Sequence, residues 1–389
     1  MRHELFLAWR YVRYHRIKST LLVLALTMTA SLPFSVDLLV SEYEKALWRR
    51  ARATPLVLGS KGNRFDLVLQ ALYFRPSRLD PVPYGVVRKV ASDGLCRAIP
   101  LAAGFTAGDQ PIIGTTLDYL EWRGLRCARG RLPGLVGEAV VGHDAARILA
   151  VEPGDTLTTD QVNVYDLART FPLRLRITGV LAPSHSPDDA AIFVDVRTHW
   201  ILEGRGHGHT ELDRPEASEF VLERSEGVVT ANAAVETYVE ITPENVESFH
   251  FHGDMADFPL SAILLLPRDE KAATILEARY RLDADWRVLD PSDVIADLVG
   301  FIFRVKRFFD ANFVVVGIST FFFLVLVIVL SGRLRAGEFR TLHRIGAGRM
   351  IVLKLFAGEL LIVLALSAIL AGAIAGLLLM FAPDLFRIL

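Results

Sequence analysis

Residues 311–332 read ANFVVVGISTFFFLVLVIVLSG and contain no charged side chain. A helix rises about 1.5 Å per residue, so this stretch is long enough to cross a hydrocarbon core about 30 Å thick. Two further stretches are also long and mostly apolar, STLLVLALTMTASLPFSVDLLV at 19–40 and IVLKLFAGELLIVLALSAILAGAIAGLLLMF at 351–381. The sequence therefore predicts three transmembrane helices, with a long polar region between the first and the second.

The composition fits a membrane protein that also carries a large water-facing region. Hydrophobic residues make up 52% of the 389 residues, and the mean hydropathy is +0.34. Lys and Arg number 43 against 44 Asp and Glu, which gives a net charge of −1. Binding to nucleic acid requires an excess or a stripe of basic residues, so nucleic acid is not an expected partner.

Basic residues in the short flanking segments predict the orientation of the helices. One group precedes the first helix: Arg2, Arg10, Arg13, Arg16 and Lys18. A second group lies between the second and third helices: Arg333, Arg335, Arg340, Arg344, Arg349 and Lys354. We therefore expect residues 1–18 and 333–350 in the cytoplasm, and residues 41–310 and the tail 382–389 outside.

The outer region 41–310 is expected to be an α+β domain with helical ends. SEYEKALWRRA continues the first apolar helix, and Asp290 followed by Pro291 is a typical start for a helix that leads into the second. Three segments have the apolar spacing of strands: 172–181, 234–242 and 261–267. Residues 268–282 have helical spacing instead.

The two cysteines, Cys96 and Cys127, both fall in this outer region. A disulfide is permitted outside the cytoplasm, and two separate thiols are the alternative. Sequence spacing does not decide between them.

No enzyme site stands out in the sequence. GSKG at 59–62 lacks the spacing of a phosphate-binding loop. Ser184, His185 and Asp188 lie together in a proline-containing turn, but a catalytic triad is recognised by geometry and not by adjacency. A polar surface turn is the favoured interpretation, and the chain is not expected to be an enzyme.

Two pairs of histidines are candidate metal ligands. They are His207 and His209 in GRGHGHTELD, and His250 and His252 in FHFHGDMAD. Residues i and i+2 of an extended segment point to the same side, so each pair shares one face. Zn²⁺ takes three or four nitrogen or oxygen ligands, and Asp254 is the carboxylate expected to join the histidines, with Glu211, Asp213 and Asp257 also nearby. The alternative is a solvent-facing strand edge and a Gly-rich loop that do not meet.

The segment 333–359, RLRAGEFRTLHRIGAGRMIVLKLFAGE, reads as a short amphipathic helix followed by a turn. Phe339, Leu342 and Ile345 fall on one side of this helix. Such a helix is suited to a groove on a cytoplasmic partner, and an ordinary basic loop is the alternative.

Gly372 and Gly376 lie one turn apart in GAIAG and allow another helix to approach closely. That helix belongs either to this chain or to another one.

The order of these elements resembles the permease subunits of ABC transporters of the MacB/FtsX/LolC type. In that family a loop similar to R-x-R-E-hydrophobic-x-x-L-R-x-hydrophobic-G-A forms the coupling helix that docks on the ATPase. Seven residues match the loop: Arg335, Glu338, Leu342, Arg344, Ile345, Gly346 and Ala347. Glu359 is similar to the acidic residue that the family often carries where the next span begins.

The outer region also carries the resemblance. VVGHDAARILAVEPGDTLTT (140–159) with RITGVL (176–181) is similar to a family segment, and LVLGSKGNRFDLVLQALYF (56–74) resembles one branch of the family. Most members have four spans, whereas this sequence shows three, so the family's dimer packing is not carried over.

The resemblance implies a permease subunit in the bacterial inner membrane that couples ATP hydrolysis, in a separate Mg-dependent ATPase, to movement of the outer domain and its cargo. The implied coupling residues are Arg335, Glu338, Phe339, Arg340, Leu342, Arg344, Ile345 and Gly346. The implied partners are this ATPase, a second copy or an unlike permease, and a periplasmic protein or lipoprotein. The alternative is an outer sensor or regulatory module, with Zn²⁺ as its ligand or as part of a metal-transport system, that moves no cargo itself.

Overall fold

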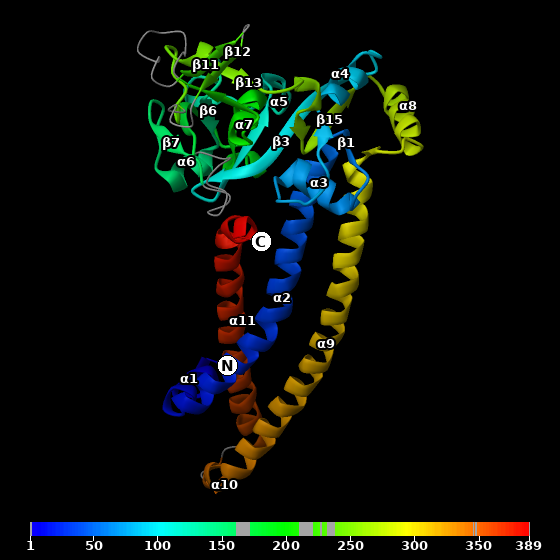
Figure 1. Cartoon of the computed structure of the whole chain (residues 1–389). Coiled ribbons are helices and arrows are strands. Elements are labelled where there is room, and N and C mark those ends of the chain that lie inside the picture. The colour runs from blue at the N-terminus through cyan, green and yellow to red at the C-terminus, as the bar shows by residue number, and fades with distance from the viewer. Residues whose placement is uncertain are drawn as a thin grey trace. The chain divides into compact units, whose positions relative to one another are not determined.

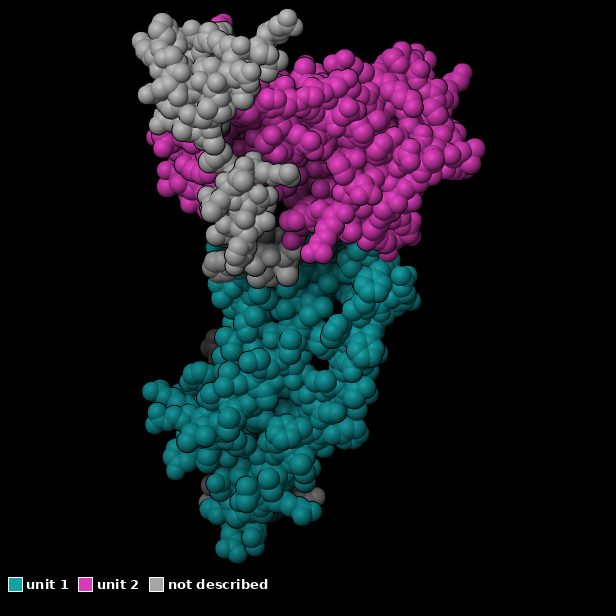
Figure 2. Space-filling view, in the orientation of Figure 1, with its two compact units in different colours: residues 1–47, 298–389 teal, residues 48–297 magenta. Residues whose placement is uncertain are grey.

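The computed structural model describes residues 2–160, 172–209, 221–225, 228–231, 238–344, 346 and 348–388. The chain divides into two compact units, which Figure 2 colours separately. Unit 1 comprises residues 1–47 and 298–389, and unit 2 comprises residues 48–297.

Unit 1 is helical. Its helices are α1 (Arg2–Tyr14), α2 (Arg16–Arg52), α9 (Pro291–Leu334), α10 (Ala336–Arg344) and α11 (Arg349–Ile388), of which α2 and α9 continue into unit 2 (Figure 1). Among the described residues, α2, α9 and the Leu353–Leu378 part of α11 are long and apolar enough to cross a membrane. Their outer faces carry exposed apolar side chains such as Phe322 and Leu326, which suit a lipid environment. The prediction of three long apolar helices is confirmed.

Polar side chains join α2 to α9 at several levels. Lys18 donates to Ser331, and the Thr29 and Thr320 hydroxyl oxygens lie 3.3 Å apart. As the residue number rises along α2 it falls along α9, so the two helices run antiparallel. Small residues and interhelical hydrogen bonds are the usual contacts between helices in lipid, where the hydrophobic effect contributes little.

Near the far end of the same helix pair, Lys306 of α9 lies 3.0 Å from the Asp37 carboxylate of α2. Asp37 is the one charged residue in the first predicted span, 19–40. The ion pair gives that carboxylate a partner in the neighbouring helix.

Unit 2 is a mixed α+β unit. Its α-helices, besides the ends of α2 and α9, are α3 (Arg64–Tyr73), α4 (Gly85–Ala91), α5 (Leu117–Trp122), α6 (His143–Leu149), α7 (Val196–Leu202) and α8 (Glu270–Arg281). Short 3₁₀ helices are η1 (Pro187–Ala190), η3 (Val246–Ser248) and η4 (Met255–Asp257). Its strands are β1 (Leu56–Ser60), β2 (Val82–Pro83), β3 (Cys96–Ala107), β4 (Gln110–Thr115), β5 (Cys127–Gly130), β6 (Glu138–Val141), β7 (Thr156–Thr158), β8 (Arg174–Leu181), β9 (Ile192–Asp195), β10 (Gly206–Gly208), β11 (Val221–Ser225), β12 (Val228–Ala231), β13 (Phe249–Phe251), β14 (Pro259–Leu260), β15 (Ala262–Pro267) and β16 (Trp286–Leu289).

One sheet of ten strands organises unit 2. Its order is β16-β1-β15-β3-β4-β9-β6-β8-β5, with β7 also paired to β8. The long strand β3 lies in the middle and serves two neighbours (Figure 1). Its first half, from Cys96 to Leu101, pairs with β15, and its second half, from Ala102 to Ala107, pairs with β4. The smaller pairs among the described strands are β10–β13, β11–β12 and β14–β2.

Two hydrophobic cores pack on this sheet. The first core lies around β1, β15 and α8 and includes Leu58, Ile263, Leu265, Leu276 and Tyr280. The second core lies around β4, β6, β8 and β9 and includes Ile112, Val141, Ile177, Ile192 and Val194. Unit 2 is therefore built as two packed halves that share strand β3.

Most of the sequence predictions for this region are confirmed. β8 falls within 172–181, β15 within 261–267 and α8 within 268–282. The Asp290 side chain accepts a hydrogen bond of 2.7 Å from the Ser292 N–H group and caps α9, as its position before Pro291 predicts.

The structure differs from the prediction of one strand and decides between the two alternatives for the cysteines. The described part of the strand predicted at 234–242, residues 238–242, is not a full strand but makes an isolated parallel bridge between Glu240 and Arg174 of β8. Its backbone also meets two strands, because Arg174 N–H donates to the Val239 carbonyl at 2.7 Å and Tyr238 N–H donates to the Gly208 carbonyl of β10 at 2.9 Å. Cys96 and Cys127 are both free thiols, because β3 and β5 are separated by four strands in the sheet.

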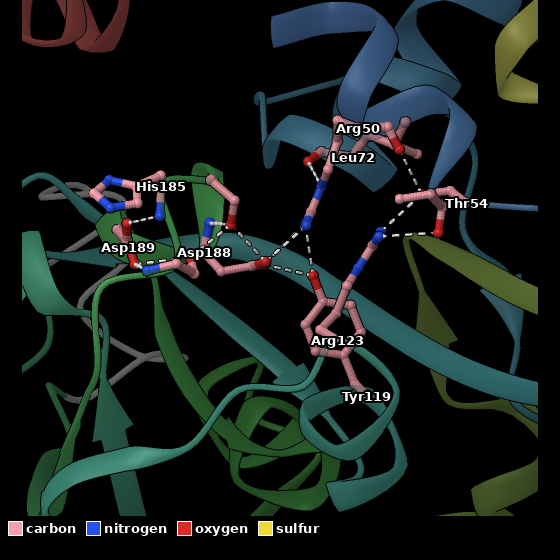
Figure 3. Close-up of polar contacts among 11 residues, drawn as sticks. Arg50, Thr54, Leu72, Tyr119, Arg123, His185, Asp188 and Asp189 are labelled. Carbon is pink, nitrogen blue, oxygen red and sulfur yellow. Dashed lines mark hydrogen bonds and ion pairs between the residues drawn. The ribbon is translucent and has the colours of Figure 1, made fainter.

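A buried ion pair fixes the end of α2 within unit 2 (Figure 3). Arg50 donates to both carboxylate oxygens of Asp188, at 2.6 and 2.8 Å, and to the Tyr119 hydroxyl at 2.8 Å. Its Nε–H group donates to the Leu72 carbonyl at 3.1 Å. The side chains of Arg50 and Asp188 are only 6% and 1% exposed. Such a bidentate arrangement leaves almost every polar atom of the buried pair with a partner.

Burial by itself would raise the pKa of Asp188, but the Arg50 guanidinium and the hydrogen bonds hold this pKa below its usual range. A depressed carboxylate pKa adds stability above the pKa of the unfolded chain, and this contribution is lost as the pH falls through the folded value. The ion pair therefore contributes fully at neutral pH.

We expect Asp188→Ala to lower the stability of unit 2 by about 3–5 kcal/mol, because a buried guanidinium would lose its charge partner. Four of the five tryptophans, Trp48, Trp122, Trp200 and Trp286, lie in unit 2, so thermal unfolding followed by tryptophan fluorescence in detergent reports on it.

The matched control is Asp118→Ala, which removes a half-exposed carboxylate 3.5 Å from Arg97 and should cost less than about 1 kcal/mol. The double change Arg50→Met with Asp188→Leu should cost less than the sum of the single changes. Equal losses of stability from Asp188→Ala and Asp118→Ala would show that the buried ion pair stabilises unit 2 no more than an exposed one.

Candidate functional site

The first candidate site is the turn between the two long helices α9 and α11. Helix α9 ends at Leu334, α10 covers Ala336–Arg344, and α11 begins at Arg349. Gly346 adopts a φ of +95°, which glycine tolerates and side-chain-bearing residues rarely adopt. The short helix expected in the 333–359 segment is therefore present.

Arg335, directly before α10, points into its own chain. Its Nη1 atom lies 3.2 Å from a Glu359 carboxylate oxygen of α11, and its Nε atom lies 3.2 Å from Glu338. Its guanidinium carbon is 3.5 Å from the centre of the Tyr11 ring of α1. With its side chain 11% exposed, Arg335 holds α1, α10 and α11 together. The expectation that Arg335 anchors a partner stays a prediction beside this role within the chain.

Phe339 also faces its own chain. Its ring centre lies 5.4 Å from that of Phe356 in α11, and the Arg335 guanidinium lies 5.2 Å from the Phe339 ring. Phe339 is partly buried by this packing, and the expectation that it also fills a groove on a partner stays a prediction. The side chain of Leu342, and Ile345 and Ala347 altogether, lie outside the described residues.

Three charged side chains of α10 are exposed. The Glu338 side chain is 61% exposed, although it also contacts Arg335. Arg340 and Arg344 are exposed as well. Of the eight residues implied by the family resemblance, these three offer their charges to the surroundings.

The close approach of helices in unit 1 occurs at a glycine that the sequence analysis did not single out. A Cβ atom placed on Gly358 of α11 would lie 3.1 Å from the Ala8 Cβ atom of α1. By contrast, a Cβ atom on Gly372 or Gly376 would meet no atom of the described chain within 4 Å. Those two predicted packing glycines leave an open face on α11.

We expect Arg335→Met to loosen α10, because it removes an ion pair and a cation–π contact that hold the helix. A local loss of about 2 kcal/mol would speed tryptic cleavage after Arg340 or Arg344 about thirtyfold where local opening limits the rate. Cleavage in detergent can be followed by mass spectrometry.

Arg333→Met serves as the control, since Arg333 is exposed and lies two residues before Arg335. Adding Glu359→Gln to Arg335→Met should cause little further loosening, because the carboxylate has already lost its partner. Cleavage rates that match those of the Arg333→Met protein would contradict the holding role of Arg335.

The second candidate site is a cluster of histidines in unit 2. Strands β10 and β13 pair antiparallel, with His207 directly opposite His250. One ligand atom from each of His207, His209 and His250 lies within 4.8 Å of the others. The His252 ring centre is 4.8 Å from that of His207 and 4.9 Å from that of His250. The structure thus brings the two pairs together, whereas the sequence left their meeting open.

The other face of the same two strands is apolar. Phe251 is opposite Gly206 and Phe249 is opposite Gly208. A Cβ atom on Gly206 would lie 2.7 Å from the Phe251 ring, and one on Gly208 would lie 2.5 Å from the Phe249 ring. These two positions therefore require glycine so that the rings can lie against the backbone.

Two observations describe the imidazoles further. His250 Nδ1 lies 3.1 Å from the Ser248 carbonyl oxygen. Since a carbonyl only accepts, this contact favours the tautomer with the proton on Nδ1, in which Nε2 is the nitrogen available to a metal. Burial, together with the neighbouring histidines, lowers the pKa of His207 and so favours its neutral, ligating form.

Asp254, the carboxylate expected to join the histidines, is not part of the cluster. Asp254 instead uses Oδ1 to accept a hydrogen bond of 2.8 Å from the Ala256 N–H group at the start of η4. Glu211 and Asp213 lie outside the described residues. Among the described residues, the candidate ligand set is therefore made of imidazoles alone.

Ser184, His185 and Asp188 do not form a catalytic arrangement. The Ser184 hydroxyl donates to Asp189 at 2.8 Å, and the His185 backbone N–H group donates to Asp189 at 2.7 Å (Figure 3). Asp188 belongs to the Arg50 ion pair. The turn is polar, as predicted, but Asp188 and Asp189 are buried, so the prediction of a surface turn is only partly right. Residue spacing carries no signal for the role of Asp188, because its partner Arg50 is 138 residues away.

Two solved structures are similar to part of this chain. The periplasmic region of MacB from Actinobacillus actinomycetemcomitans has a TM-score of 0.35 and 11% identity, and the match covers 65% of this chain and 97% of that region. The extracellular domain of the noncanonic ABC-type transporter YknZ from Gram-positive bacteria has a TM-score of 0.31 and 11% identity, over 60% of this chain and 98% of that domain.

No protein-family model matches the sequence, and no curated protein matches it either. The two similar structures are of the same kind as the family that the sequence resembles. At TM-scores below 0.5 neither similarity bears on the function of this chain, which is inferred below from its own residues.

Proposed function

We propose that this chain is the permease subunit of an ABC transporter of the MacB/FtsX/LolC type, in a bacterial inner membrane, and that α10 docks on a separate cytoplasmic ATPase. The observation that carries the proposal is that α10 is both held and exposed. Arg335 and Phe339 hold it to α1 and α11, while the charged side chains of Glu338, Arg340 and Arg344 remain exposed.

A docking helix must be both fixed and accessible. The contacts of Arg335 fix α10 to its neighbours, so a force applied to the helix reaches α9 and α11 without first unfolding it. The exposed charges suit charge-assisted hydrogen bonds to a partner of complementary charge. Most of the energy of such an interface is expected from a few residues of this kind.

Two of the long helices of unit 1, α2 and α9, extend into unit 2. Helix α2 ends at the buried Arg50–Asp188 pair, and α9 begins at the cap formed by Asp290. A second contact joins Arg64 and Asp297, 2.8 Å apart, at the first turns of α9. In the proposed mechanism, ATP-driven closure of the ATPase moves α10, and the two continuous helices carry that movement to the outer domain, which handles the cargo.

The open face of α11 around Gly372 and Gly376 supports a second permease, either another copy or an unlike one, as a neighbour. In this proposal the ATPase supplies the ATP and Mg chemistry, and this chain contributes no catalytic residue. A periplasmic protein or lipoprotein is the proposed source or recipient of the cargo.

We expect an ABC ATPase to co-purify with the full-length chain from its native membrane in mild detergent, identified by mass spectrometry. An intact, folded chain that repeatedly brings no ATPase would overturn the proposal and favour the sensor alternative.

We expect Glu338→Lys with Arg344→Glu to weaken binding of that ATPase at least about tenfold and to abolish its stimulation, because like charges would then face each other. Membrane insertion should be unchanged. ATPase activity of the reconstituted pair in lipid discs measures the effect.

The control is Glu121→Lys with Arg126→Glu, which makes the same exchange of charges at two exposed positions of unit 2. This protein should stimulate the ATPase as the unaltered chain does. Full stimulation by the Glu338→Lys/Arg344→Glu protein would mean that α10 does not dock through the charges of these two residues.

A further inference from the structure

We propose that His207 of β10, His250 of β13, and His209 and His252, which directly follow these strands, bind one Zn²⁺ ion, and that the bound ion clamps the two cores of unit 2 to each other. This site is independent of α10 and of ATPase docking, so it goes beyond the function proposed above.

The geometry of the four imidazoles suits a zinc ion. Nitrogen ligands lie about 2.0–2.1 Å from Zn²⁺, so two of them at tetrahedral angles are about 3.3 Å apart. The ligand atoms of His207, His209 and His250 lie within 4.8 Å of one another, so small side-chain rotations bring them to that spacing. His252 is adjacent to two of these rings and completes a set of four.

One face of the two strands is packed against the protein, and the face that carries the histidines is open to solvent. The rings of Phe249 and Phe251 lie against Gly208 and Gly206, which fixes the register that sets His207 opposite His250. A backbone hydrogen bond of 2.9 Å from His252 to Arg205 continues the same ladder. The His250 and His252 side chains are exposed, so an ion can enter from solvent.

A carbonyl group orients one of the ligands. The contact between His250 Nδ1 and the Ser248 carbonyl leaves Nε2 as the ligating atom. Histidines that bind metals usually donate their second nitrogen in this way, which fixes the tautomer and the ring. The residues already present supply this support.

The same strands connect the two cores. Phe251 packs against the first core and Phe249 against the second. His207 and His250 are 43 residues apart in sequence, so an ion bound to both closes a long loop at the point where the cores meet. Binding to the folded state alone raises the temperature at which unit 2 unfolds.

The first test is titration of the full-length, metal-stripped chain in detergent with Zn²⁺ alone, by calorimetry and by metal analysis after dialysis. We expect one Zn²⁺ per chain, and an affinity loss of about tenfold or more in His207→Ala/His250→Ala. The matched control His143→Ala/His185→Ala deletes two exposed histidines of unit 2 and should bind as the unaltered chain does. No binding, or equal binding by all three proteins, would overturn the site.

A second measurement uses the unaltered chain, so its result does not depend on whether a histidine variant folds. Chemical modification of histidines in the unaltered chain, mapped by mass spectrometry, should show Zn²⁺ protecting His207, His250 and His252 but not His143 or His185. Co²⁺ in the same site should give the intense visible absorption of a tetrahedral ion. Protection of other histidines, or an octahedral spectrum, would contradict the assignment.

The clamp is tested by thermal unfolding followed by tryptophan fluorescence. Zn²⁺ should raise the midpoint for the unaltered chain and for His143→Ala/His185→Ala, but not for His207→Ala/His250→Ala. Zn²⁺ that binds without raising the midpoint would refute the clamp. No ATPase takes part in these measurements, so their outcome is separate from that of the co-purification.

Discussion

The architecture of unit 2 depends on bringing one guanidinium and one carboxylate together away from water. Each charged group costs several kcal/mol to desolvate, and the cost is offset only when the geometry is excellent. Arg50 meets Asp188 through two parallel hydrogen bonds, with the Tyr119 hydroxyl donating to the same carboxylate at 2.7 Å. A pair of this kind tolerates little displacement, so the last turns of α2 have one position within the unit.

The turn between α9 and α11 also depends on an arginine that is paired with a carboxylate away from water. Arg335 is also nearly buried and also meets a carboxylate, Glu359, but an aromatic ring from α1 covers it. An inward arginine at each place gives the helices fixed ends. Helices that end in such contacts can transmit a displacement, whereas helices that end in loose loops would lose it to local motion.

The sequence was sufficient to predict an element wherever that element depends on residues close together in the chain. Apolar length identified the three long helices, the Asp290 cap marked the start of α9, and β8, β15 and α8 followed from their periodicity. The sequence was insufficient where two distant segments must meet. Neither the pairing of Arg50 with Asp188 nor the inward direction of Arg335 leaves a trace in residue spacing, and the alternation at 234–242 did not show that its described part makes only an isolated bridge to β8.

The histidine cluster lies between these two cases. Alternation alone placed each pair of histidines on one face, but their meeting required the register of β10 on β13, which Phe249 and Phe251 determine by packing on Gly208 and Gly206. A slip of one residue would turn the phenylalanines to solvent and the histidines toward the cores, at the cost of both burials. Burial of the phenylalanines therefore assembles the imidazoles before any ligand arrives. A ligand of this face would then bind to side chains that are already ordered, and would lose less affinity to their ordering.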